Sequence, residues 1–285
     1  MVKSVNDAVL DLARELRLRG ISGSRVEARD LVCTALGIEP EQLESYRNKY
    51  VFDTQWSRIC ELRDQRLSGV PVQYLTGRWE FFGLPLEVSR DTLIPRPDTE
   101  TLAQEGINFL GGRGRSRMLD LCCGTGCVGI AVLKRCAEVS GVLADLSQPA
   151  LTVARKNLLR HNLTGRGLTL CLDALDAPDE GLGKFQLILC NPPYIPTGEL
   201  DALDPEVRCE PRMALDGGED GLTFYRAVAE HYQHVLSPDG ALMFEVGIGQ
   251  SGSVRDIMDK LGYRQLRTVR DVPGVERVVC GVRPN

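Results

Sequence analysis

The sequence predicts an α/β protein in which a small helical domain and a β-hairpin linker precede a Rossmann-like, doubly wound sheet. Three observations support this prediction. Apolar residues recur at helical spacing over residues 1–75. Residues 76–98 combine a short hairpin pattern with two closely spaced prolines. From residue 99 to residue 285, short apolar runs alternate with helical patterns, as in a parallel sheet covered on both faces.

The first domain, residues 1–75, is predicted to be a helical bundle without chemistry of its own. Val5, Leu12 and Leu16 follow one helical stripe, and glycines such as Gly20 and Gly37 separate the helices. No cluster of histidine, cysteine or acidic residues in this domain has the spacing of a metal site.

The linker is predicted over residues 76–98. The run 79–88 favours a hairpin that turns at residues 83–85, because a glycine and a proline stand there between apolar residues. Pro95 and Pro97 then keep the chain extended, since proline restricts both itself and the residue before it. Such a segment is a natural bridge between two domains.

The second domain, residues 99–285, is predicted to contain a doubly wound sheet. Its apolar runs lack the alternation of a half-exposed strand, so the strands are expected to be buried on both faces. Helices are expected between them, at 149–161 and 222–236. The expected strands are 118–121, 142–144, 168–172, 185–189 and 241–246.

Composition excludes several classes of protein. The chain has 285 residues, of which 43% are hydrophobic and 26% are charged, as in a globular protein of about two domains. No apolar run approaches the roughly 18 residues of a membrane span, and the acidic residues near the start argue against a targeting peptide. Ten cysteines without an export signal indicate reduced thiols. We therefore expect a cytoplasmic protein that does not associate with membranes.

The charge distribution argues against a nucleic-acid partner. The formal net charge is −5, and residues 1–75 hold eleven basic and eleven acidic residues. A protein that binds nucleic acid concentrates positive charge to neutralise phosphates. The balance therefore favours a protein or a small molecule as the partner, with no direct nucleic-acid binding.

A glycine-rich turn follows the first predicted strand. Gly124, Gly126 and Gly129 satisfy the G-x-G-x-x-G pattern, which by itself also fits a nicotinamide-dependent oxidoreductase. Asp120, however, stands at the carboxyl end of the strand, where a negative charge is unfavourable beside phosphates and favourable beside a cation. S-adenosylmethionine carries a sulfonium and no phosphate, so it suits this turn. The alternative for Asp120 is a residue that caps the helix or the turn.

Acidic residues also close the next two strands. Asp145 lies nineteen residues beyond Gly126, where a carboxylate can accept both hydroxyl groups of an adenosine ribose. Asp173 closes the third strand and can accept from the adenine amine, with Ala174 beside it. The alternative for both acids is an ordinary turn residue. We include both, together with Ala174, among the predicted cofactor-binding residues.

The cysteines near the turn do not predict a metal site. Cys122 and Cys123 are adjacent, so their side chains diverge, and no histidine or second C-x-x-C pair completes a tetrahedral set with Cys127. We therefore expect no metal cofactor.

The loop Asn191-Pro192-Pro193-Tyr194 follows the fourth predicted strand and predicts an amine acceptor site. A planar NH2 group has two hydrogens that need two acceptors in a site without water, and the Asn191 amide oxygen and the Pro192 carbonyl can supply them. The two prolines hold that carbonyl in place, and Tyr194 offers an aromatic surface. Both acceptors bind more strongly as positive charge develops on the nitrogen, which favours the transition state. Because this loop and the glycine turn face one crevice, Asn191 also counts among the cofactor-binding residues.

Over nearly its full length the chain resembles the release factor glutamine methyltransferases, also called PrmC or HemK. The loop at residues 191–194 is shared with DNA and RNA methyltransferases, whereas the other matching segments are more specific to this family. Those segments are 69–77, 80–84, 93–100, 204–208, 210–212, 214–218 and 220–222.

The resemblance implies a seven-stranded methyltransferase sheet and a helical domain that helps dock the release factor. It implies methyl transfer from S-adenosylmethionine to the side-chain amide of the glutamine in the Gly-Gly-Gln motif of peptide chain release factors, leaving S-adenosylhomocysteine. The family's ribose acid corresponds to Asp145 and its substrate loop to residues 191–194. Its cofactor turn corresponds to Cys122, Cys123, Gly124, Thr125 and Gly126.

The chain departs from the family pattern in two places. Cys122 and Cys123 stand where relatives have glycine and a small residue, and a positive φ at Cys122 implies strain. Ala174 stands where relatives often have a bulkier residue that covers adenine. Both departures are expected to weaken cofactor binding without removing a catalytic group.

Three other functions remain open from the residues alone. An exocyclic-amine methyltransferase that acts on nucleic acid uses the same acceptor loop, but the chain lacks a basic domain. A nicotinamide-dependent oxidoreductase shares the glycine pattern. A cofactor-binding protein without catalysis would retain the turn and lack turnover.

Overall fold

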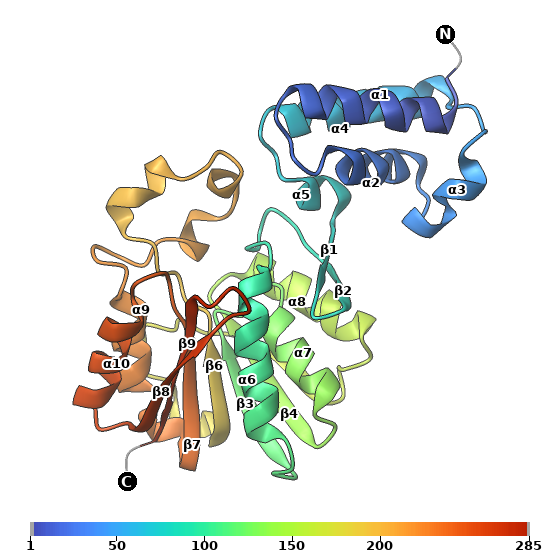
Figure 1. Ribbon diagram of the computed structural model, residues 1–285. Coiled ribbons are helices and arrows are strands. Elements are labelled where there is room, and N and C mark those ends of the chain that lie inside the picture. Colours follow the sequence, from blue (N-terminus) through green and yellow to red (C-terminus); the bar gives the residue numbers. More distant parts are fainter. Residues whose placement is uncertain (1–2, 284–285) are drawn as a thin grey trace. The chain divides into compact units, whose positions relative to one another are not determined.

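The computed structural model describes residues 3–283, which form two compact units (Figure 1). The helical unit comprises the residues up to Arg78 together with the segment 204–209, and the α/β unit comprises 79–203 and the residues from Glu210 onward. The segment 204–209 thus groups with the helical unit, although the sequence analysis assigned it to the second domain. Its place depends on tertiary contacts that no local pattern displays.

The helical unit is built from amphipathic helices. Ser4 caps the first of them by accepting from the Asp7 backbone N–H, and the Asp7 side chain in turn accepts from the Ser4 backbone N–H. Gly37 ends the second helix with a left-handed φ of 66°, which glycine adopts without strain. The helices are α1 (Val5–Leu18), α2 (Ser24–Leu36), η1 (Pro40–Gln42), α3 (Leu43–Tyr46), α4 (Asp53–Leu67) and α5 (Val72–Thr76).

One apolar core holds these helices together. Leu12 and Leu16 of α1, Leu31 of α2 and Ile59 and Leu62 of α4 are almost fully buried against each other. The apolar stripe predicted for α1 is therefore the helix face that packs into the core of the helical unit.

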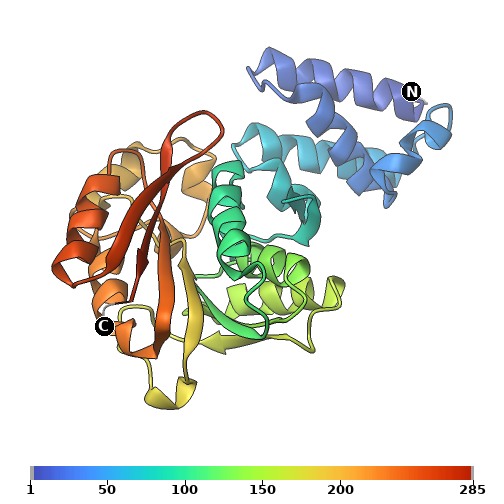
Figure 2. The same cartoon turned by 60° about the horizontal axis from the view of Figure 1, so that its bottom comes forward.

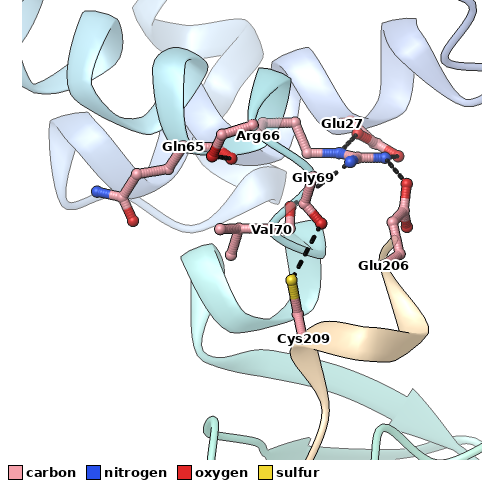
Figure 3. Close-up of polar contacts among 8 residues, drawn as sticks. Glu27, Gln65, Arg66, Gly69, Val70, Glu206 and Cys209 are labelled. Atoms are coloured by element: carbon pink, nitrogen blue, oxygen red, sulfur yellow. Dashed lines mark hydrogen bonds and ion pairs between the residues drawn. The ribbon is translucent and has the colours of Figure 1, made fainter. Parts of the chain in front are cut away.

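A buried arginine connects the segment 204–209 to this unit (Figure 3). The Arg66 side chain on α4 is only 4% exposed, and its guanidinium donates to Glu27 of α2 at 2.6 Å and to Glu206 at 2.7 Å. The Cys209 thiol donates to the Gly69 carbonyl at 3.5 Å. A guanidinium can satisfy two carboxylates at once because its donors lie in a planar fork. One side chain therefore joins α2, α4 and a segment distant in sequence.

Substitution Arg66→Met is expected to destabilise the helical unit by about 3 kcal/mol, because it leaves Glu27 largely buried without its cationic partner. It also releases Glu206, so trypsin should cleave faster at Arg208 in the neighbouring turn. Circular dichroism melting and limited proteolysis measure the two effects. Arg58→Met on the same helix removes only an exposed pair with Glu61 and serves as the control. Equal melting and cleavage of the two variants would contradict the prediction.

The predicted hairpin is present as β1 (Arg78–Phe81) and β2 (Leu84–Glu87). Its turn uses Phe82 and Gly83, which both have positive φ, so Pro85 lies inside β2 and not in the turn as predicted. Within the α/β unit, the Asn157 amide of α8 (Gln148–Arg160) accepts from the Glu87 backbone N–H at 2.7 Å and donates to the Glu87 carbonyl at 3.0 Å. This pair of bonds attaches β2 to the unit that carries the sheet.

The α/β unit contains the seven-stranded sheet that the family resemblance implied, in the order β5-β4-β3-β6-β7-β9-β8. The first five strands in this order are parallel, and β9 runs antiparallel to both of its neighbours. The strands are β3 (Ser116–Leu121), β4 (Val139–Asp145), β5 (Gly167–Cys171), β6 (Phe185–Cys190), β7 (Leu236–Glu245), β8 (Arg264–Arg270) and β9 (Glu276–Val282).

Helices cover both faces of the sheet, as Figures 1 and 2 show. Residues of α6, α7 and α8 pack in one apolar cluster against one face, and residues of α9 and α10 pack in a second cluster against the other face. Strand β3 contributes Met118 to the first cluster and Leu119 and Leu121 to the second. The helices not yet given are α6 (Glu100–Leu110), α7 (Cys127–Arg135), α9 (Thr223–His231) and α10 (Ser251–Lys260).

Short 3-10 turns fill the connections between these elements. The helix predicted over 222–236 ends at His231 and continues as the separate turn η7 (Gln233–Val235). The other turns are η2 (Pro97–Thr99), η3 (Glu180–Leu182), η4 (Thr197–Ala202), η5 (Val207–Cys209) and η6 (Arg212–Ala214). Within residues 3–283, no helix combines the length and the apolar character that a membrane crossing requires.

Candidate active site

A cavity of about 500 Å³ is the centre of the candidate site. The residues that follow β3, β4, β5 and β6 all contribute to its lining, so it lies at the carboxyl ends of parallel strands. A cavity of this size suits a ligand as large as a nucleoside with an attached side chain. From the sequence-predicted set, it brings together Asp120, Cys122, Cys123, Gly124, Thr125, Asp145, Asp173, Ala174, Asn191 and Pro193.

The glycine turn has little spare room. Cys122 has a φ of 55°, which is the strained conformation that the sequence analysis anticipated for a non-glycine residue there. A Cβ atom at Gly126 would lie 2.7 Å from Leu143 Cδ2, and one at Gly129 would lie 2.8 Å from the Asp120 carboxylate. Gly126 is not among the cavity-lining residues of the described chain, so its role is to let α7 approach β4.

Asp120 caps a helix and lines the cavity at once. Its Oδ2 accepts from the Gly129 backbone N–H at 2.8 Å in the first turn of α7. The residue is only 2% exposed, and burial raises the pKa of its carboxyl to about 7. The capping role considered as an alternative is therefore present. A cation bound in the cavity would offset the cost of burying this charge.

Asp145 organises the turn from the next strand. Its Oδ2 accepts from the Gly124 backbone N–H at 2.8 Å and its Oδ1 from the Ser147 backbone N–H at 2.9 Å. Burial raises the pKa of this carboxyl above its usual value, although these backbone donors favour the charged form. Each carboxylate oxygen can accept a second hydrogen bond, so Asp145 retains acceptors for a diol in the cavity.

Asp173 and Ala174 line the cavity beyond β5. Asp173 Oδ1 accepts from the Leu175 backbone N–H at 2.9 Å, which is the turn role considered as its alternative. Ala174 is 6% exposed and belongs to the apolar cluster under α9 and α10. The two residues thus present one polar and one apolar group to the same end of the cavity.

The acceptor loop contributes Asn191 and Pro193 to the lining. The Asn191 amide donates through Nδ2 to Thr99 Oγ1 at 3.3 Å, so its nitrogen faces the protein. Pro192 is buried, and neither it nor Tyr194 belongs to the cavity lining of the described residues. Burial raises the pKa of Tyr194 to about 12, and its carbonyl accepts from Gln250 at 2.9 Å. The roles of Pro192 and Tyr194 in catalysis stay predictions.

Several lining residues were not predicted. Thr99 is the first residue of the predicted second domain, directly after the predicted linker, and Asp216 and Phe224 come from beyond the acceptor loop. The family-specific run 93–100 was the available signal for Leu93, Pro95 and Thr99, but by themselves its prolines predict only an extended bridge between domains. The lining residues that were not predicted are Asp91, Thr92, Leu93, Pro95, Thr99, Cys127, Val128, Leu146, Ser147, Ala150, Leu172, Leu175, Thr197, Pro211, Met213, Ala214, Asp216, Gly218, Thr223 and Phe224.

Charged residues near the loop mostly form structural pairs. Glu210 is 5% exposed and accepts from the Ile94 backbone N–H at 2.9 Å and from the Arg96 guanidinium. Asp220 pairs with Arg226, whose hydrogen bond lowers the pKa of Asp220 to about 2. None of the residues in these two ion pairs belongs to the cavity lining of the described chain.

All ten cysteines are free thiols. Burial raises the pKa of Cys127 to about 12, so this thiol stays protonated at neutral pH. Among residues 3–283, no group of three or more histidine, cysteine or acidic residues is arranged to hold a metal ion.

Comparison with known proteins agrees with this geometry. Residues 106–204 match the model of the methyltransferase small domain, and residues 7–77 match that of the PrmC N-terminal domain. The crystal structure of a methyltransferase from Pyrococcus furiosus shares the fold, with a TM-score of 0.54 at 17% identity over 82% of this chain and 100% of that one. The family-model match therefore indicates a methyltransferase domain over residues 106–204, and the solved structure agrees with it in fold.

Curated relatives narrow the class further. The release factor glutamine methyltransferase of Geobacter sulfurreducens is 38% identical over 96% of this chain and 95% of that protein. The enzyme of the same name from Agrobacterium fabrum is 35% identical over 97% of this chain and 96% of its own length. The chain belongs to the family of release factor glutamine methyltransferases.

Proposed function

We propose that this enzyme methylates the side-chain amide nitrogen of the glutamine in the Gly-Gly-Gln motif of peptide chain release factors. S-adenosylmethionine supplies an electrophilic methyl group on its sulfonium, which passes to the nitrogen by direct SN2 displacement and leaves S-adenosylhomocysteine. The observation that carries the proposal is that one cavity is lined by Asn191 and by the two carboxylates of Asp120 and Asp145.

The residues present fit this cofactor. Within residues 3–283 the buried Asp120 carboxylate has no cationic partner, and an amino acid ammonium or a sulfonium would provide one. Asp145 retains lone pairs for the two ribose hydroxyls, and Asp173 and Ala174 are assigned to adenine. The turn residues Cys122, Cys123, Gly124 and Thr125, which line the cavity, are assigned to the amino acid portion, and Gly126 is assigned a part in cofactor binding through the close packing of this turn. We propose that no metal takes part.

For the acceptor, Asn191 Oδ1 and the Pro192 carbonyl are proposed to accept the two hydrogens of the glutamine NH2 group. Pro193 holds the loop, and Tyr194 is proposed to contact the planar amide. As the nitrogen gains positive charge, both oxygens bind it more strongly, and its proton leaves after methyl transfer. No base is needed before the bond to carbon forms.

Residues 1–75 are proposed to dock the release factor, with residues 76–98 as the connecting hairpin and 99–285 as the catalytic domain. The match of residues 7–77 to an N-terminal domain model named for this family supports that division. The reaction is proposed to take place in the cytoplasm, where ten free thiols stay reduced, without direct binding to nucleic acid or membranes.

Mass spectrometry of a release factor incubated with the enzyme and S-adenosylmethionine tests the proposal. We expect the mass of one added methyl group, confined to the peptide that contains Gly-Gly-Gln. A release factor with Gly-Gly-Glu in its place is the control and should remain unmodified. Methyl label that appears in added RNA or DNA, or an unmodified Gly-Gly-Gln peptide, would refute it.

A further inference from the structure

Glu245 is a buried acid that the proposed reaction does not use. It is the last residue of β7 and is only 2% exposed. Its Oε2 has no hydrogen-bond partner among the described residues. Native proteins rarely leave a buried carboxylate oxygen unsatisfied, because each missing partner costs about 1–3 kcal/mol. The unsatisfied Glu245 carboxylate therefore suggests a functional role for this residue.

The position of Glu245 follows from the register of the sheet. Cys190 of β6 pairs with Phe244 of β7 in a parallel ladder, so the next residues, Asn191 after β6 and Glu245 at the end of β7, lie side by side. Burial raises the pKa of Glu245, whereas hydrogen bonding with Thr99 and Asn191 lowers it. Thr99 and Asn191 line the cavity, whereas Glu245 does not. Glu245 therefore stands directly behind the acceptor loop.

An asparagine side chain has a donor end and an acceptor end of nearly the same shape, and its surroundings decide which end faces the substrate. An ionised carboxylate accepts hydrogen bonds only. Beside Glu245, and with Nδ2 also donating to Thr99, the Asn191 nitrogen must face the protein. Its Oδ1 is then left for the cavity.

We propose that Glu245 is a positioning residue that orients the Asn191 amide so that its oxygen, and not its NH2 group, meets the acceptor nitrogen. This inference rests on the proposed function, since it matters only if the acceptor is an NH2 donor. A reversed amide would place two NH2 groups against each other and remove one of the two acceptors.

The groups around Glu245 make the orientation of the Asn191 amide dependent on pH. Burial raises the pKa of Glu245 to about 7, and the negative charge of Asp98 in η2 raises it further. Thr99, Arg277 on β9 and Asn191 act in the opposite direction and lower this pKa. Tyr194, Tyr225 on α9 and Cys127 on α7 also face it, and the pKa of each is raised by burial. The carboxylate is ionised above its pKa, so the correct orientation is held above about pH 7 and is lost as the pH falls below it.

Glu245→Gln should lower kcat roughly tenfold or more at pH 8, because glutamine can also donate and no longer enforces one orientation. The KM for S-adenosylmethionine should change little. In an Asn191→Ala background the same substitution should have no further effect, since the amide it orients is gone. Glu105→Gln, which removes a carboxylate paired with Arg267 elsewhere, is the matched control and should retain full kcat. An unchanged kcat in Glu245→Gln, or fully additive losses in the double variant, would overturn the proposal.

A second readout does not depend on the substrate. The side-chain amide signals of Asn191 in a ¹⁵N NMR spectrum, assigned by their loss in Asn191→Ala, should titrate with a midpoint near pH 7 in the wild-type protein. The titration should disappear in Glu245→Gln, although Asp120, whose pKa is also about 7, is retained. Asn191 signals that do not respond to pH, or that titrate equally in both proteins, would overturn the inference. If the signals titrate as expected and no release factor is methylated, the proposed function fails while the positioning contact stands.

Discussion

Asn191→Ala should lower the rate of release factor methylation by roughly 10²–10³-fold, the cost of removing one group that stabilises charge in a transition state. The side chain lines the cavity and is held by Thr99, so its loss removes an acceptor from a preorganised site. The KM for the release factor should change less than kcat, because the lost interaction strengthens as positive charge develops on the acceptor nitrogen. Single-turnover kinetics with saturating S-adenosylmethionine measure the effect.

Two controls make this result specific. Asn108→Ala removes an exposed amide on α6 and should leave the rate unchanged. Calorimetry with S-adenosylhomocysteine should show that Asn191→Ala still binds the product, although Asn191 is also predicted to border the cofactor. A variant that retains more than half of the wild-type rate would refute the acceptor role. A wild-type protein that binds cofactor and never turns over would favour a binding protein without catalysis.

Asp145→Ala should weaken binding of S-adenosylhomocysteine by roughly 100-fold or more. Each hydrogen bond to a charged group contributes about 1.5–3 kcal/mol, and the carboxylate is assigned two ribose hydroxyls. Its oxygens also accept from the backbone of Gly124 and Ser147, so the turn itself loses two internal bonds. Isothermal titration calorimetry measures the affinity.

The matched control is Asp179→Ala. Asp179 accepts from the Gly181 backbone N–H at 2.6 Å in an exposed turn outside the cavity lining, so it tests the loss of a similar turn bond alone. Product affinity should be unchanged in this variant. Equal affinity in the Asp145 and Asp179 variants would refute the ribose assignment. Binding of NAD without binding of S-adenosylhomocysteine would instead revive the oxidoreductase interpretation of the glycine pattern.

Most of the sheet was predictable because buried parallel strands are short, continuous apolar runs. The strand observed at Phe185–Cys190 starts where it was predicted and ends one residue later, and the loop after it contributes Asn191 and Pro193 to the cavity lining. The ends of other elements were not predictable. Strand β7 starts at Leu236, five residues before the apolar run that revealed it, because Pro238 and Asp239 interrupt the pattern without ending the strand. Sheet pairing overrides local preference at such positions.

Sequence patterns alone were enough to predict the α/β class, the glycine turn, the acids at the strand ends and the acceptor loop. These features depend on neighbours within a few residues and on the rule that parallel strands bring their carboxyl ends to one edge. Two contacts become visible only in the folded chain: Arg66 joins Glu206 to the helical unit, and Glu245 lies behind Asn191. Both contacts join residues far apart in the chain, and their free energy comes from burial and charge pairing that exist only after the chain has folded.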